Sequence, residues 1–189
     1  SAIVYGTIIL YGAVGEILTE KSGNLNLGVP GLMSLGAVGG FITARAYEVL
    51  YCGSAGISPA PLLCILCALL GALLFSGLGG LLYSFLTISL RANQNVTGLT
   101  LTIFGCAVAN YYGSALLQLH GGVGSLSLSV TSSAFRAVIP GLENVTVFYA
   151  LGWLVYVSIA LAIFMQWFLN RTRVGLNLRA VGESPATAD

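Results

Sequence analysis

Three long stretches of the chain contain no charged residue, and they limit what it can fold into more than any other feature. They cover residues 49–90, 92–135 and 144–170. A helix needs about 20 apolar residues to cross a bilayer core about 30 Å thick, so each stretch can hold at least one crossing. Only 7% of the 189 residues are charged, against about 25% in a soluble domain. Because so few charges cannot cover a water-exposed surface, the sequence predicts an integral membrane protein.

Hydropathy divides the chain into five predicted spans, at residues 2–18, 29–50, 61–90, 96–119 and 147–169. Each run is long and apolar on every face, unlike the short alternating segments of barrel strands. We therefore expect an all-α, polytopic transmembrane helical bundle that forms one domain over residues 1–189. The chain starts inside an apolar run without methionine and stops at Asp189 in a polar stretch, so we expect a larger protein, truncated at both ends.

The distribution of lysine and arginine predicts the orientation of the bundle. With alternating spans, one side receives Lys21, Arg91, Arg171, Arg173 and Arg179. The other side receives Arg136, together with Arg45 near the end of the second span. The positive-inside rule makes the first side cytoplasmic. The net charge of +1 is not gathered into a basic run of the kind that binds phosphates, which excludes nucleic acid as a partner.

Small residues repeat every four positions in two predicted spans. The third span carries Cys64, Ala68, Ala72, Ser76, Gly80 and Ser84, and the second carries Gly36, Gly40 and Ala44. Lipid provides little hydrophobic drive for helices to associate, so the close approach of backbones holds them together. We expect each row to make a close, crossed contact with another helix.

The first polar interruption, EKSGNLNLGVPG at residues 20–31, separates the first two spans. One interpretation is a plain cytoplasmic connection. The other is a broken or re-entrant segment near residues 22–31, because irregular backbone at membrane depth needs protein or water around it and transporters use such breaks to bind substrate. We include Asn24 and Asn26 in a predicted substrate pathway. Glu16, just before the interruption, is either an interfacial carboxylate or a residue with a role in coupling or gating.

The second interruption, RANQNVTG at residues 91–98, combines amides with a hydroxyl. Neutral amides both donate and accept hydrogen bonds, which suits an uncharged, hydroxylated substrate, so Gln94, Asn95 and Thr97 join the predicted pathway. They lead into a polar row on the fourth span, made of Gly98, Thr102, Cys106, Asn110 and Ser114. Asn110 either makes an interhelical hydrogen bond or lines a hydrated pathway.

Three blocks of the chain carry a family resemblance. Residues 15–33 read GEILTEKSGNLNLGVPGLM, residues 92–105 read ANQNVTGLTLTIFG, and residues 172–189 read TRVGLNLRAVGESPATAD. They resemble, in the same order, the blocks G-E-x-x-x-E-[RK]-[ST]-G-x-x-N-L-G-x-x-G-x-M, A-N-Q-x-x-[ST]-G-L-x-L-T-x-x-G and T-x-x-G-x-x-x-R-A-V-G-E-x-P-x-A-A-D of ABC importer permeases of the nucleoside and simple-sugar (branched-chain amino acid and ribose-type) family. Thr187 stands where alanine is usual. The resemblance covers most of the chain and implies the N-terminal part of such a permease.

The resemblance implies a permease domain that translocates a small polar solute, a nucleoside or a simple sugar, by alternating access across the bacterial cytoplasmic membrane. It also implies cytoplasmic ABC ATPase subunits, a second permease subunit, and an extracytoplasmic substrate-binding protein or lipoprotein as partners. The chain has no G-x-x-x-x-G-K-[ST] loop, which binds ATP phosphates, so we expect no enzyme activity, cofactor or metal in the chain itself. Residues 171–189 resemble the cytoplasmic coupling segment, with Arg173, Gly175, Arg179, Gly182, Glu183 and Pro185 as the residues expected to couple to the ATPase.

Two other function classes fit the sequence less well. An ion-coupled secondary transporter predicts acidic or histidine residues deep within spans, and only Glu16 comes near. An intramembrane enzyme would depend on His120, the single histidine, at a span end. Cys64 and Cys67 form a C-x-x-C without a second pair, which indicates small apolar membrane residues rather than metal or redox chemistry.

Overall fold

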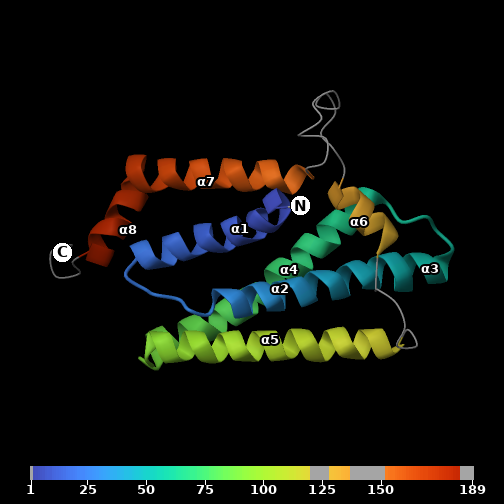
Figure 1. Cartoon of the computed structure of the whole chain (residues 1–189), viewed down its shortest axis with the longest axis horizontal. Coiled ribbons are helices and arrows are strands. Elements are labelled where there is room, and N and C mark those ends of the chain that lie inside the picture. The colour runs from blue at the N-terminus through green and yellow to red at the C-terminus, as the bar shows by residue number, and fades with distance from the viewer. Residues whose placement is uncertain (1, 120–127, 137–151, 184–189) are drawn as a thin grey trace.

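The computed structural model describes residues 2–119, 128–136 and 152–183, and all regular elements of these residues are helices (Figure 1). In chain order they are α1 (Ala2–Lys21), α2 (Val29–Arg45), η1 (Ala46–Tyr51), α3 (Cys52–Ala55), α4 (Pro61–Ser84), η2 (Phe85–Ser89), α5 (Gln94–Leu119), α6 (Ser129–Arg136), α7 (Trp153–Arg171) and α8 (Arg173–Glu183). The segments η1 and η2 are π-helical continuations of α2 and α4. The predicted all-α bundle is confirmed.

Four helices of the described residues are long and apolar enough to cross a bilayer, and they match four of the predicted spans. They are Ala2–Lys21, Pro61–Ser89, Gln94–Leu116 and Trp153–Arg171. The remaining predicted span, residues 29–50, is formed by α2 and η1. Alone, α2 has 17 residues, or about 26 Å at 1.5 Å per residue, so the π-helical turns bring it closer to the thickness of the bilayer core. The predicted start of the last span, residues 147–151, lies outside the described residues.

The long helices run along one axis in two groups (Figure 1). In the first group, α2 packs against α4, which crosses it obliquely, and against α5. In the second group, α1 packs against α7, and α8 turns back from the end of α7 toward the end of α1. The direct contact between α1 and α2 is small. The chain that connects the two groups at this end of the bundle is the interruption between α1 and α2.

Small residues bring α2 and α4 close together, as the two predicted rows require. A Cβ atom added to Gly36 would lie 3.4 Å from the carbonyl oxygen of Ala72, and one added to Gly40 would lie 2.9 Å from that of Ala68. Across the same contact, the Thr43 hydroxyl lies 2.8 Å from the carbonyl oxygen of Cys67. The two rows therefore face each other. A Cβ atom added to Gly80, further along the row on α4, would have no neighbouring atom within 4 Å. The contact therefore uses only the first part of that row.

The two ends of the bundle differ in their basic residues. Lys21 ends α1, Arg91 lies between η2 and α5, Arg171 ends α7, and α8 carries Arg173 and Arg179. Figure 1 shows that all of these elements meet at one end of the bundle. We call it the cytoplasmic end, following the charge-based orientation. Arg45 and Arg136 lie on elements at the opposite end.

At that opposite end, Glu48 of η1 caps the short helix α6. Its carboxylate accepts hydrogen bonds from the backbone N–H groups of Val130 and Thr131, both at 3.0 Å, and from the Thr131 hydroxyl at 2.6 Å. The first N–H groups of a helix have no partner within the helix, and a carboxylate satisfies them well. Glu48 therefore fixes α6 to η1 at the end of the first helix group, a role the sequence did not indicate.

Candidate substrate pathway and coupling helix

The interruption between α1 and α2 enters the bundle. Residues 22–28 are not helical, and Gly23 adopts a left-handed conformation with φ of 85°. The Thr102 hydroxyl of α5 donates a hydrogen bond to the Leu27 carbonyl oxygen at 2.7 Å. A Cβ atom added to Gly98 would lie 2.9 Å from the nitrogen of Gly28. Gly98 and Thr102 follow the first residue of α5 by four and eight residues, which is about 6 and 12 Å along the helix. The structure therefore favours a broken segment inside the bundle over a plain external connection.

Residues from three other helices satisfy the backbone groups of this broken segment. The Asn26 N–H donates to the Glu16 carboxylate of α1 at 3.1 Å, and the Tyr83 hydroxyl of α4 donates to the Leu25 carbonyl oxygen at 3.0 Å. Together with Thr102, these groups replace the hydrogen bonds that a helix would have made internally. Irregular backbone at membrane depth needs such partners, because an unsatisfied polar group costs several kcal/mol in hydrocarbon. Glu16 is thus a structural support of the break and not only an interfacial carboxylate.

Asn26 and Asn24 take different places in the break. Asn26 is only 7% exposed, and its side-chain oxygen accepts a hydrogen bond from the Gly28 N–H at 2.9 Å. This Asx-type turn leads the chain into α2. Asn24 is half-buried. Of the two predicted pathway amides, Asn26 therefore shapes the break, and Asn24 is the more accessible.

The other predicted pathway residues all lie on α5 but do not gather at one point. Gln94 is its first residue and is half-buried, Asn95 is exposed, and Thr97 is buried. Thr97 and Asn110 are 13 residues apart in the same helix, or about 20 Å. Asn93, which we did not single out, caps α5 by accepting a hydrogen bond from the Asn95 N–H at 3.0 Å. The preference for asparagine at this position is the signal that could have found it.

The polar row on α5 divides into two parts. Gly98 and Thr102 contact the break, and the Cys106 sulfur lies 3.6 Å from the Ser34 hydroxyl oxygen of α2. These residues belong to the contact between α2 and α5. Asn110 and Ser114 are exposed, and neither forms a hydrogen bond within the described part of the chain. Polar side chains within membrane spans face protein or water rather than lipid, so Asn110 is the better candidate for a hydrated pathway.

The C-terminal helix α8 starts directly after α7, where Thr172 turns the chain. Thr172 has an extended backbone, its hydroxyl donates to the Phe168 carbonyl oxygen at 2.7 Å, and its hydroxyl oxygen accepts the Gly175 N–H at 3.0 Å. Threonine is a favoured N-cap residue, which explains why the new helix begins here. Gly175 allows the close approach, because a Cβ atom there would clash with the same carbonyl oxygen of Phe168.

One face of α8 packs against the turn that opens the broken segment. A Cβ atom added to Gly182 would clash with the Lys21 carbonyl oxygen and lie 3.0 Å from the Gly23 nitrogen. Conversely, a Cβ atom on Gly23 would lie 3.3 Å from the Cα atom of Gly182. Two glycines thus place α8 in backbone contact with the segment that enters the bundle.

The predicted coupling residues are divided between the two faces of α8. Gly175 and Gly182 face the bundle, and Arg179 also turns inward, where its Nη1 atom donates to the Asn170 side-chain oxygen at 3.0 Å. Arg173 and Glu183 are exposed. Pro185 lies outside the described residues. The outer face also exposes residues that the resemblance did not single out, namely Val174, Leu176, Asn177, Ala180 and Val181.

Comparison with known proteins decides the family. The family described as branched-chain amino acid transport system / permease component matches residues 1–189. The chain belongs to this permease family. A nucleoside ABC transporter permease protein, NupC, of Lactococcus lactis subsp. cremoris is 31% identical over 99% of the chain and 56% of its own length. A guanosine ABC transporter permease protein, NupQ, of Bacillus subtilis is 30% identical over the whole chain and 56% of its own length.

A third relative of the permease is a putative glucose ABC transporter permease protein, TsgC13, of Haloferax volcanii. It is 29% identical over 97% of the chain and 50% of its own length. The permease chain thus spans about half the length of the curated relatives it matches. No solved structure matches it significantly. The family and the apolar helices together make the chain a multi-pass integral protein of the bacterial plasma membrane.

Proposed function

We propose that the complete protein is the permease subunit of an ATP-driven ABC importer that moves a small polar solute, a nucleoside or a simple sugar, by alternating access. The names of the relatives TsgC13, NupC and NupQ, which refer to glucose, nucleosides and guanosine, support this substrate range. Its partners are two cytoplasmic ABC ATPase subunits, a second permease subunit, and an extracytoplasmic substrate-binding protein or lipoprotein. ATP hydrolysis belongs to the ATPase subunits and not to this chain.

The observation that carries the proposal is the position of α8. Its inner face touches the broken segment through Gly182 and Gly23, while its outer face is exposed at the cytoplasmic end. A helix with one face free and the other on the irregular part of a span is suited to transmit a push from a soluble partner. We assign Arg173 and the exposed residues around it to the ATPase contact, and Gly182 to transmission into the bundle.

The substrate pathway is proposed to run beside the broken segment and along α5. Asn24, Asn26, Gln94, Asn95, Thr97 and Asn110 are its candidate residues. Asn110 is the best-supported of these, because an exposed amide without a hydrogen bond in the described chain suits a water-filled surface. These candidates carry no formal charge, which suits an uncharged solute with several hydroxyl groups. An ion-coupled transporter is less well supported, because the Glu16 carboxylate, which contacts the break, is engaged in supporting its backbone.

The ATPase contact is tested with two matched charge reversals. Arg173 of α8 and Arg91, which lies between η2 and α5, are both exposed arginines at the cytoplasmic end. The complete permease is co-expressed with candidate ABC ATPases of its organism and purified through a tag on the permease. We expect Arg173→Glu to lower the affinity for the ATPase by about tenfold, or about 1.4 kcal/mol, and Arg91→Glu to leave it unchanged. If no ATPase associates with the folded native permease, the importer proposal is wrong.

The substrate is tested separately in proteoliposomes. The reconstituted transporter, with its binding protein, is offered nucleosides and simple sugars, and ATP hydrolysis and uptake are measured together. We expect one of these classes to stimulate both. A transporter that hydrolyses ATP but responds to neither class would keep the importer assignment and refute the substrate assignment.

A further inference from the structure

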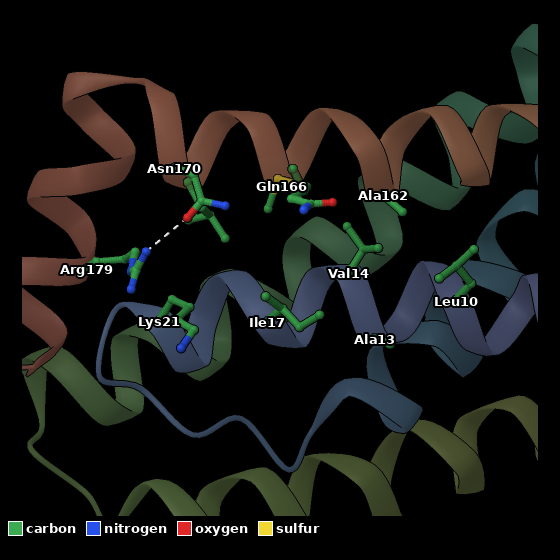
Figure 2. A pocket seen from close by; sticks show the side chains of 11 residues that line it. Leu10, Ala13, Val14, Ile17, Lys21, Ala162, Gln166, Asn170 and Arg179 are labelled. Carbon is green, nitrogen blue, oxygen red and sulfur yellow. Dashed lines mark hydrogen bonds between the residues drawn. The ribbon is translucent and has the colours of Figure 1, made fainter.

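A cavity lies between α1, α7 and α8 at the cytoplasmic end of the second helix group. Its volume is about 410 Å³, within the range of about 300–1,000 Å³ typical of small-molecule sites. Most of its wall is apolar, formed by Leu10, Val14 and Ile17 of α1 and by Met165 and Leu169 of α7. Figure 2 shows Leu10, Val14 and Ile17 along one wall, with α7 on the other side. This apolar wall follows the two helices away from the cytoplasmic end.

The end of the cavity nearest the cytoplasm is basic. Lys21 closes it from α1, Arg179 from α8 and Asn170 from α7. Arg179 donates to Asn170 at 3.0 Å and lies 3.8 Å from the Glu183 carboxylate, whose side chain is 74% exposed. Lys21 forms no ion pair within the described chain. None of the residues that line the cavity is acidic, so the two cations are not neutralised within it.

We propose that this cavity binds an anionic phospholipid of the cytoplasmic leaflet. Its phosphate lies between Lys21 and Arg179, and one acyl chain follows Leu10 and Val14 toward the membrane interior. Basic pockets between transmembrane helices on the cytoplasmic side are suited to anionic head groups, and each lysine or arginine near the surface contributes about 1 kcal/mol.

The combination of charge and apolar wall selects this occupant over two others. A soluble anion would match Lys21 and Arg179 but would leave the apolar wall in contact with water. Another apolar helix of the protein would match the wall but would leave Lys21 without an anion and Arg179 with only the exposed Glu183 carboxylate, which is costly near the membrane. Only an amphipathic anion satisfies both ends.

The lipid has a consequence for α8, which rests on the proposed function. Lys21 ends α1 and Arg179 belongs to α8, so a phosphate between them ties the coupling helix to α1 beside the contact of Gly182 with Gly23. The lipid site itself does not depend on that function, and it is tested by binding alone.

The test measures lipid binding to the complete permease by native mass spectrometry, with phosphatidylglycerol and phosphatidylcholine added at equal concentration. We expect phosphatidylglycerol to bind more tightly. Lys21→Gln weakens its binding about fivefold, the equivalent of about 1 kcal/mol. The matched control Arg91→Gln removes one positive charge from the same end, away from the cavity, and leaves binding unchanged. Ala162→Phe, which fills the apolar part without changing charge, also weakens binding.

Several results would overturn the proposal. One is equal binding of the two lipids, and another is an equal loss in Lys21→Gln and Arg91→Gln, which would mean attraction to surface charge rather than a site. A third is displacement of the lipid by millimolar inorganic phosphate, which would identify a soluble anion as the occupant. Cross-linking of Leu10→Cys to another part of the complete protein would show that protein fills the cavity. If Ala162→Phe does not fold, the comparison of Lys21→Gln with Arg91→Gln decides alone.

Discussion

Substituting Gly182 by alanine tests whether α8 acts on the broken segment through its backbone contact. The added methyl group meets the Lys21 carbonyl oxygen and the Gly23 nitrogen, and neither backbone atom can move aside as a side chain could. Overpacking of this kind costs about 1–3 kcal/mol, and alanine recovers about 1 kcal/mol through its higher helix propensity. The net cost is up to about 2 kcal/mol, or about 30-fold in the population in which α8 is docked.

The assay separates ATPase binding from coupling. Because Gly182 faces the bundle, we expect Gly182→Ala to bind the ATPase normally but to transport several-fold less solute per ATP hydrolysed in proteoliposomes. Gly77→Ala is the control, because a methyl group added to this glycine of α4 would meet no neighbouring atom within 4 Å. Normal coupling in Gly182→Ala would refute the idea that this contact transmits motion. Loss of ATPase binding would refute the inward role of Gly182.

Three further predictions concern the broken segment and the pathway. Glu16→Ala leaves the Asn26 N–H without its partner and lowers the free energy of unfolding by about 1–3 kcal/mol, whereas Glu16→Gln, which keeps an acceptor, restores most of the thermal stability. Thr102→Val removes the donor to the Leu27 carbonyl oxygen, so we expect a similar loss in thermal unfolding, with Thr102→Ser as the rescuing variant. Asn110→Leu lowers solute uptake at least several-fold with unchanged thermal stability, and an unchanged rate of uptake would remove Asn110 from the pathway.

The spans could be predicted because their signal is local. Absence of charge and the length of each apolar run located α1, α4 and α5 to within a few residues. Helix ends deviated where side chains can reach the interface: α1 continues from residue 18 to Lys21, whose long side chain can extend to water. The row on α2 and the first part of the row on α4 also predicted the close contact between these helices correctly, because spacing by four places residues on one face of a helix.

The interior of the site could not be predicted because its signals are not local. Tyr83 supports Leu25 from 58 residues away, and Thr102 supports Leu27 from 75 residues away. No spacing rule connects such pairs. In the sequence, a single tyrosine or threonine within an apolar helix gives the same signal whether its side chain faces lipid or a broken backbone. Only the packing of α2, α4 and α5 therefore assigns these roles.

The sequence also could not show which residues of α8 face the bundle and which face the partner. The resemblance grouped Arg173, Arg179 and Gly182 as coupling residues, yet which of them faces the partner depends on how Thr172 turns the chain after α7. A different turn would rotate the whole helix. The structure turns Arg179 and Gly182 inward, so we assign to the ATPase only the residues on the outer face.

The contacts along the proposed route from α8 into the bundle share one physical property. Gly182 meets the turn at Gly23, Gly28 meets Gly98 of α5, and a Cβ atom on Gly31 would clash with the backbone of α5. In each case backbone lies against backbone, so no side chain can change rotamer and absorb a displacement. A push on α8 should therefore reach α5 through the broken segment with little loss.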